Sequence, residues 1–100
     1  MGRKILTYSL ELEDVKESKI LDDLDKITEF NKTLADKYNL YTVSVLENDN
    51  LCFEGKLFSN TKSENDAKLK LLIGELKEFY KAYGLKRVAK NLLLYGNTIY

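Results

Sequence analysis

The apolar residues in the second half of the chain recur at helical spacing, and they are the strongest periodic signal in the sequence. They form one broad stripe of Leu69, Leu72, Ile73, Leu76, Phe79, Tyr80 and Tyr83. A helix with a single apolar stripe has to bury it against another layer. Either Thr61 with Glu64 or Ser63 with Asp66 can start this helix as a capping box, and Gly84 is placed to end it.

A second amphipathic helix is predicted earlier in the chain. Asp14 followed by Glu17 resembles a capping box, with Asp in place of the usual Ser or Thr. The apolar row that follows is Ile20, Leu24, Ile27, Leu34 and Tyr38, widened by Leu21 and Phe30. Asn39 tolerates the left-handed conformation that ends a helix. We therefore expect one long helix up to about Tyr38.

Strict alternation predicts the strands. Residues 4–12 place Leu6, Tyr8 and Leu10 on one face, and Leu12 continues the row. Residues 40–58 read as a hairpin with the three-residue loop 48–50, in which Asn50 takes the left-handed position. One face then pairs Val45 with Phe53, Val43 with Gly55 and Tyr41 with Leu57. The other face pairs Leu46 with Cys52, Ser44 with Glu54, Thr42 with Lys56 and Leu40 with Phe58. A two-residue loop would mix the faces.

The last part of the chain fits two structures. Helical spacing is carried by Leu85, Val88, Ala89 and Leu92. The run from Leu92 to Tyr95 is also short and apolar enough for a buried strand. We favour a short helix from about Lys86 to Leu94 that is stopped by Gly96.

These elements predict a single α+β domain over residues 1–100. The order is β-α-β-β-α plus a C-terminal short helix or strand, with a three-stranded, mainly antiparallel sheet and both long helices on one face. A final strand would make the sheet four-stranded and complete a ferredoxin-like arrangement, with the first helix crossing between parallel neighbours. Such a fold hosts many functions, so function has to come from a site.

Composition narrows the chemistry. The 100 residues include no His, no Pro, no Trp and one Cys, so we expect no metal site, no cofactor and no catalysis. Asp22, Asp23 and Asp25 cluster near the start of the predicted first helix, and we interpret them as favourable charges near a helix N-terminus. The single thiol, Cys52, is expected on the sheet face away from the core as an inert small hydrophobe. No apolar run is long enough to span a bilayer and no signal peptide is recognisable, which predicts a cytoplasmic protein.

Charge is unevenly distributed along the chain. Residues 1–50 hold eleven acids and seven bases, and residues 51–100 hold five acids and nine bases. The basic region of Lys81, Lys86, Arg87 and Lys90 accompanies Tyr80, Tyr83, Tyr95 and Tyr100. Lys can neutralise phosphates and Tyr can stack on bases, so nucleic-acid binding by this region is the alternative function.

The leading hypothesis is a small non-catalytic protein-binding module. If the helices cover one sheet face, the other is half apolar, and such a surface often marks a partner or homodimer contact. The residues assigned to it are Leu40, Thr42, Ser44, Leu46 and Phe58. Fourteen Lys against two Arg suggests an AT-rich genome. A phage or mobile-element inhibitor of a host defence protein therefore fits the composition.

Overall fold

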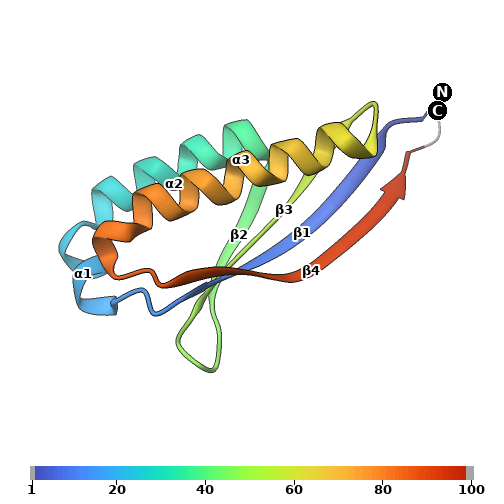
Figure 1. The fold of residues 1–100 in the computed structure, drawn as a ribbon. Coiled ribbons are helices and arrows are strands. Elements are labelled where there is room, and N and C mark those ends of the chain that lie inside the picture. Colours follow the sequence, from blue (N-terminus) through green and yellow to red (C-terminus); the bar gives the residue numbers. More distant parts are fainter. Residues whose placement is uncertain (1, 99–100) are drawn as a thin grey trace.

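The computed structural model describes residues 2–98 and contains two layers, with helices packed on one face of a sheet (Figure 1). The elements are β1 (Lys4–Glu13), α1 (Glu17–Asp22), α2 (Leu24–Tyr38), β2 (Leu40–Val45), β3 (Leu51–Ser59), α3 (Lys62–Tyr80), the short 3-10 helix η1 (Lys81–Tyr83) and β4 (Arg87–Asn97). The α+β class and the position of the long helices on one sheet face are confirmed.

The sheet has four strands in the order β2-β3-β1-β4, and every neighbouring pair is antiparallel. The ferredoxin-like arrangement is not formed as stated, because the expected crossing of the first helix between parallel neighbours is wrong. β3 lies between β1 and β2, and β1 lies between β3 and β4. Each helical connection therefore passes over an intervening strand.

The core lies between the sheet and the two long helices. The sheet contributes Leu6, Tyr8, Leu10, Leu12, Phe53 and Leu57, α2 contributes Ile27, Leu34 and Tyr38, and α3 contributes Leu69, Leu72, Leu76 and Tyr80. The alternation in β1 and the stripe in α3 therefore predicted the buried faces correctly. Phe30 and Phe79 extend the contact between the helices, with ring centroids 3.8 Å apart in a stacked pair.

The expected helix ends are confirmed where the sequence offers specific chemistry. Thr61 caps α3, because its Oγ1 accepts a hydrogen bond from the Glu64 N–H at 3.1 Å. Asn39 ends α2 in the left-handed conformation at φ 49°. Gly84 follows η1 at φ 91°, a conformation that glycine adopts without a Cβ penalty.

The first helical segment differs from the expectation, because it consists of two helices that meet at Asp23. Asp14 does not cap a helix. It adopts a φ of 69°, and Lys16 occupies the N-cap position of α1 without a side-chain hydrogen bond. The Lys16 N–H donates to the carbonyl of Tyr83 at 2.8 Å. This hydrogen bond connects the start of α1 to the end of η1. A helical period alone does not predict such a long-range contact.

The C-terminal segment is a strand, so the expected short helix from Lys86 to Leu94 is wrong. β4 pairs along the whole of β1, and the register shifts between Ser9 and Leu10. Ser9 pairs with Leu92 while Leu10 pairs with Lys90, which leaves Asn91 as an extra residue. A bulge of this kind breaks the period of two, and the broken alternation resembled helical spacing.

The hairpin forms, but its register and loop differ from those expected. Val45 pairs with Leu51 and Val43 with Phe53, a shift of two residues that leaves each strand's faces unchanged. The loop is closed at its ends by the Leu46 N–H, which donates to the Asn50 carbonyl at 2.8 Å. Asp49, rather than Asn50, takes the positive φ, at 67°.

A second irregularity in the hairpin lies at Tyr41. Thr42 pairs with Glu54 and Leu40 with Gly55, so Tyr41 is the extra residue of a bulge. The bulge reverses the direction of Leu40, which joins the core with 8% of its surface exposed. Leu40 therefore does not lie on the uncovered face, where the three-residue loop would have placed it.

Candidate interaction surface

The sheet face opposite the helices, called the outer face below, has no covering element among residues 2–98 (Figure 1). The register defines it strand by strand. β1 contributes Ile5, Thr7, Ser9 and Glu11, β3 contributes Cys52, Glu54, Lys56 and Phe58, β4 contributes Ala89, Leu92, Leu94 and Gly96, and β2 contributes Thr42 and Ser44. On β1 and β3 these positions alternate with the core residues.

Leu92 and Leu94 are the most exposed apolar side chains of the outer face. Each exposes 53% of its surface. Ile5 and Phe58 pair across β1 and β3 at one end of the face and are half-buried. The Arg3 guanidinium carbon lies 5.9 Å from the centroid of the Phe58 ring. Leu92, Leu94, Ile5 and Phe58 are together called the apolar strip of the outer face, and Arg3 places a cation at its end.

Two buried side chains, those of Ser9 on β1 and Cys52 on β3, lie beside each other on the outer face. Ser9 Oγ and Cys52 Sγ lie 3.2 Å apart, with 9% and 4% of the two residues exposed. Cys52 pairs with Ser44 on β2 and with Glu11 on β1, not with Leu46 as expected. The neighbouring side chains shield this thiol, so it contributes packing rather than a reactive group.

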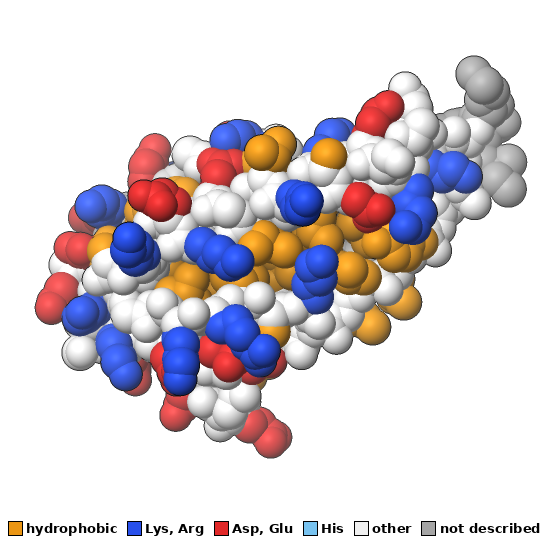
Figure 2. Space-filling view, viewed as in Figure 1, with side chains coloured by type: hydrophobic (Ala, Val, Ile, Leu, Met, Phe, Trp, Pro, Cys, Tyr) orange, Lys and Arg blue, Asp and Glu red, His pale blue; other side chains and the backbone are white. Residues whose placement is uncertain are grey.

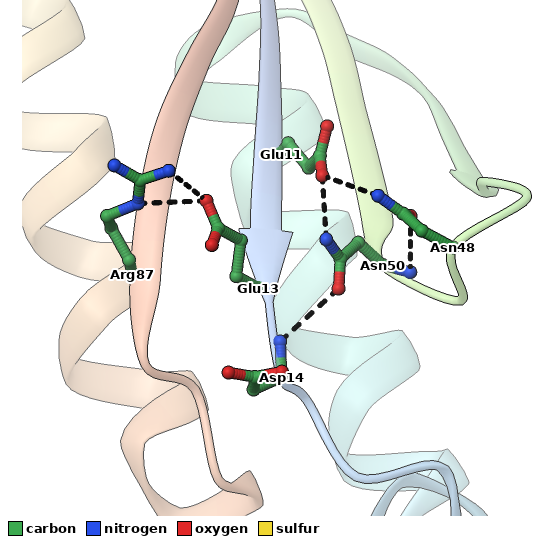
Figure 3. Close-up of polar contacts among 6 residues, drawn as sticks. All are labelled: Glu11, Glu13, Asp14, Asn48, Asn50 and Arg87. Atoms are coloured by element: carbon green, nitrogen blue, oxygen red, sulfur yellow. Dashed lines mark hydrogen bonds and ion pairs between the residues drawn. The ribbon is translucent and has the colours of Figure 1, made fainter.

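One end of the face is fixed by a polar network (Figure 3). The Glu11 carboxylate accepts hydrogen bonds from Asn50 Nδ2 at 2.6 Å and from Asn48 Nδ2 at 3.1 Å. These two amides hold the pKa of Glu11 below its ordinary value, with Asn50 the larger cause. The network ties the hairpin loop to β1.

The neighbouring carboxylate is engaged as well (Figure 3). Glu13 Oε2 accepts hydrogen bonds from Arg87 Nε at 2.8 Å and from Arg87 Nη2 at 2.5 Å. Asn50 Oδ1 accepts from the Asp14 N–H at 3.4 Å. These contacts join the hairpin loop, β1 and β4, so they stabilise the frame of the outer face.

The structure brings together three of the five residues assigned to a partner surface. Thr42, Ser44 and Phe58 lie on the outer face. Leu40 is in the core, and Leu46 is half-buried in the hairpin loop. Sequence reasoning missed Leu92 and Leu94, because the C-terminal segment was assigned to a helix.

The basic region is only partly assembled. Lys90 lies with Lys70 in a groove of about 270 Å³ between α3 and β4, called the basic groove below. It is lined also by Asp66, Leu69, Ile73, Leu93 and Tyr95. Lys and Arg side chains flank an apolar band along this groove (Figure 2). Lys81 lies in η1 and Lys86 in the connection to β4, while Arg87 is engaged by Glu13.

The tyrosines expected to accompany these bases mostly serve other roles. Tyr80 and Tyr83 are buried, with 0% and 3% exposed. The Tyr95 hydroxyl donates to Asp66 Oδ1 at 2.9 Å, and Lys62 Nζ lies 4.7 Å from its ring centroid. Tyr100 lies outside the described residues. One exposed ring therefore remains beside the basic groove.

The acidic cluster lies at the break between α1 and α2, where Asp22, Asp23 and Asp25 line one pocket. Asp25 lies in the first turn of α2, where it favours the helix dipole, and Asp23 Oδ2 accepts a hydrogen bond from the Tyr83 hydroxyl at 2.9 Å. Over residues 2–98, no three potential metal-ligating side chains lie close enough to hold an ion. In the same described segment, no helix is long and apolar enough to cross a membrane.

Comparison with protein-family models, with curated proteins and with solved structures finds no significant match. The functional argument therefore depends on the geometry of the surfaces.

Proposed function

We propose that this chain is a small non-catalytic protein-binding module that uses the outer face of its sheet. The observation that carries the proposal is the exposure of Leu92 and Leu94, each 53%, on a face where Ile5 and Phe58 extend the apolar strip. Apolar side chains gathered on an uncovered face, with polar residues around them, are typical of interaction sites.

The polar side chains support binding rather than chemistry. Glu11 and Glu13 are engaged by amides and by Arg87, and Asp66 and Glu75 accept hydrogen bonds from tyrosine hydroxyls. Carboxylates held in this way stabilise the scaffold. The lysine-rich composition of the chain adds the proposal of an inhibitor from a phage or mobile element, which would act by occupying a host protein's surface.

Site-specific photo-crosslinking tests the proposal. A photoreactive amino acid replaces Leu94, and a matched one replaces Leu71 on α3, which is 64% exposed on the helical side. In cells that express the protein, we expect a discrete protein adduct from position 94 and none from position 71. Equal labelling from the two positions, or none from position 94, would contradict a protein-binding role for the outer face.

Nucleic-acid binding is the second candidate, and the basic groove between α3 and β4 favours it. Lys70 and Lys90 share the groove, and more Lys and Arg side chains flank it (Figure 2). The burial of Tyr80 and Tyr83 removes two of the expected stacking residues. Binding of RNA and DNA oligonucleotides, measured at two salt concentrations, tests this candidate, because phosphate contacts give a steep loss of affinity with salt.

A further inference from the structure

We infer that the partner of the outer face is a second copy of this chain, packed sheet to sheet about a two-fold axis. The inference rests on the proposed function, because it uses the same face. The charges of the outer face indicate both the partner and the direction of the two-fold axis.

The register places opposite charges in adjacent rows of the outer face. In one row Lys56 pairs with Thr7, and Thr7 pairs with Leu94. In the next row Glu54 pairs with Ser9, and Ser9 pairs with Leu92. The two rows therefore have the same layout, with a charge on β3, a small hydroxyl on β1 and a leucine on β4. Only the sign of the charge differs between them.

A two-fold axis that lies in the interface, runs across the strands and passes between these rows exchanges one row with the other. It faces each strand with the same strand of the partner, so Lys56 meets the partner's Glu54 and Leu94 meets the partner's Leu92. Both contacts occur twice, as in any isologous interface. The Lys56 side chain is exposed and the Glu54 side chain is half-buried. Neither residue belongs to the three ion pairs within residues 2–98.

The rows at either end of the face add one carboxylate, that of Glu11, and otherwise uncharged residues. Phe58 and Ile5 form the row beyond Lys56, with the Arg3 guanidinium over the Phe58 ring. Cys52 and Glu11 form the row beyond Glu54. The same axis exchanges these end rows, so Phe58 meets the partner's Cys52 and Ile5 meets the partner's Glu11, whose carboxylate is already held by Asn48 and Asn50.

The other simple two-fold axis runs along the strands, and the charges oppose it. It would keep each row against the same row of the partner but reverse the order of the strands, so an axis over β1 would set Lys56 against the partner's Leu94 and Glu54 against the partner's Leu92. Charges buried against apolar side chains, with no opposite charge in the same row, are unfavourable. The charge layout therefore selects the axis across the strands.

Sedimentation equilibrium of charge variants tests the inference. We expect the natural chain to form dimers, and Lys56→Glu or Glu54→Lys to raise the dissociation constant about tenfold or more, because each creates two like-charge contacts. The double variant Lys56→Glu with Glu54→Lys exchanges the two rows and should restore the dissociation constant to within about threefold of the natural value. Leu92→Lys should also dissociate the dimer, while Leu71→Lys on α3 should leave it unchanged.

A chain that stays monomeric at millimolar concentration would overturn the inference. A dimer that the double variant does not restore would overturn the arrangement. Thermal melts of each variant separate loss of association from loss of folding. A monomer that still gives an adduct with a different protein from position 94 would overturn the second copy as partner and leave the proposed function standing. A dimer that is insensitive to every outer-face variant would overturn the inference, whereas the absence of any adduct from position 94 would contradict the proposed function.

Discussion

At the scale of single residues, Gly55 is required by the close approach of Tyr8. Tyr8 donates its hydroxyl to the carbonyl of Tyr38 at 2.9 Å and passes directly over Gly55. A Cβ at position 55 would meet the Tyr8 hydroxyl and would lie 2.6 Å from the carbonyl oxygen of Asn39. We therefore expect Gly55→Ala to destabilise the protein by about 1–3 kcal/mol in urea melts.

Gly74 provides the matched control for this glycine. It lies inside α3, and a Cβ there would meet no atom within 4 Å. Gly74→Ala should stabilise the protein by roughly 0.5–1 kcal/mol, because alanine has the higher helix propensity. Equal effects of the two substitutions would contradict the close approach at Gly55.

Leu76 lies at the centre of the α3 stripe and has 0% of its surface exposed. Leu76→Ala should cost about 2–5 kcal/mol, because it removes buried apolar atoms and leaves a cavity. Leu71→Ala on the same helix, where the side chain is 64% exposed, should change the free energy of unfolding by under about 0.5 kcal/mol. A loss below about 1 kcal/mol at Leu76 would show that the buried face has been assigned wrongly.

Glu75 links α2 to α3 and makes stability depend on pH. The Tyr38 hydroxyl donates to its carboxylate, and Lys37 Nζ lies 2.9 Å from its Oε1. These contacts, the hydroxyl first, hold the pKa of Glu75 below its ordinary value, while burial and then Glu75 raise the pKa of Tyr38 to about 12. Because the folded pKa of Glu75 is the lower one, its contribution is present above the unfolded pKa and is lost as pH falls through the folded pKa.

Glu75→Gln should therefore flatten the decline in stability below about pH 4.3, the ordinary pKa of Glu. Urea melts of the natural chain and the variant at pH 7, 4 and 3 measure the difference. Parallel declines in the two proteins would show that this carboxylate does not carry the pH dependence.

At the scale of elements, the sequence offers two capping residues for the start of α3, Thr61 and Ser63, and the structure uses Thr61. Thr61 Oγ1 accepts from the Glu64 N–H, and the Thr61 backbone is extended at φ −135° and ψ 156°. Thr61→Ala should cost about 1 kcal/mol. Ser63 lies two residues later, inside the first turn of α3, so Ser63→Ala should cost much less. A larger loss at Ser63 in thermal or urea melts would move the cap to the second candidate.

The elements that the sequence predicts well are those with an uninterrupted period and specific end chemistry. The α3 stripe, its Thr61 cap and the stop at Gly84 all agree with the structure. β1 also agrees, because its alternation continues from Leu6 to Leu12 without interruption. In these elements the local preference and the tertiary contacts favour the same structure.

The elements that sequence reasoning assigned wrongly contain bulges or depend on distant contacts. The extra residue Asn91 hides the alternation of β4, and the extra residue Tyr41 turns Leu40 into the core. The hairpin register is supported by Asn48 and Asn50, whose amides bind Glu11 on another strand. No local pattern reports such a contact.

The residues of the outer face also divide into those that the sequence predicts and those that depend on distant pairing. Thr42, Ser44 and Phe58 could be placed on the outer face because a register shift of two residues preserves the faces. Leu92 and Leu94 could not, because their place depends on the pairing of β4 with β1. The apolar run from Leu92 to Tyr95 was the signal that could have found them.

At the scale of the whole molecule, the basic groove and the outer face lie on different sides of the sheet. The basic groove lies on the helical side, between α3 and β4, whereas the outer face lies on the other side of the sheet (Figures 1 and 2). A dimer formed through the outer faces would leave both basic grooves exposed, pointing away from each other. The central claim is therefore that one side of the sheet is covered by a second copy.

Solvent accessibility of leucine methyl groups, measured by NMR, tests this claim most directly. A soluble paramagnetic agent broadens the signals of exposed methyl groups. In a concentrated sample of the natural chain, Leu92 and Leu94 should resist broadening, whereas Leu71 should be broadened strongly. Dilution below the dissociation constant, or the substitution Lys56→Glu, should expose Leu92 and Leu94 together. If Leu92 and Leu94 broaden as strongly as Leu71 at every concentration, the outer face is open and the account is wrong.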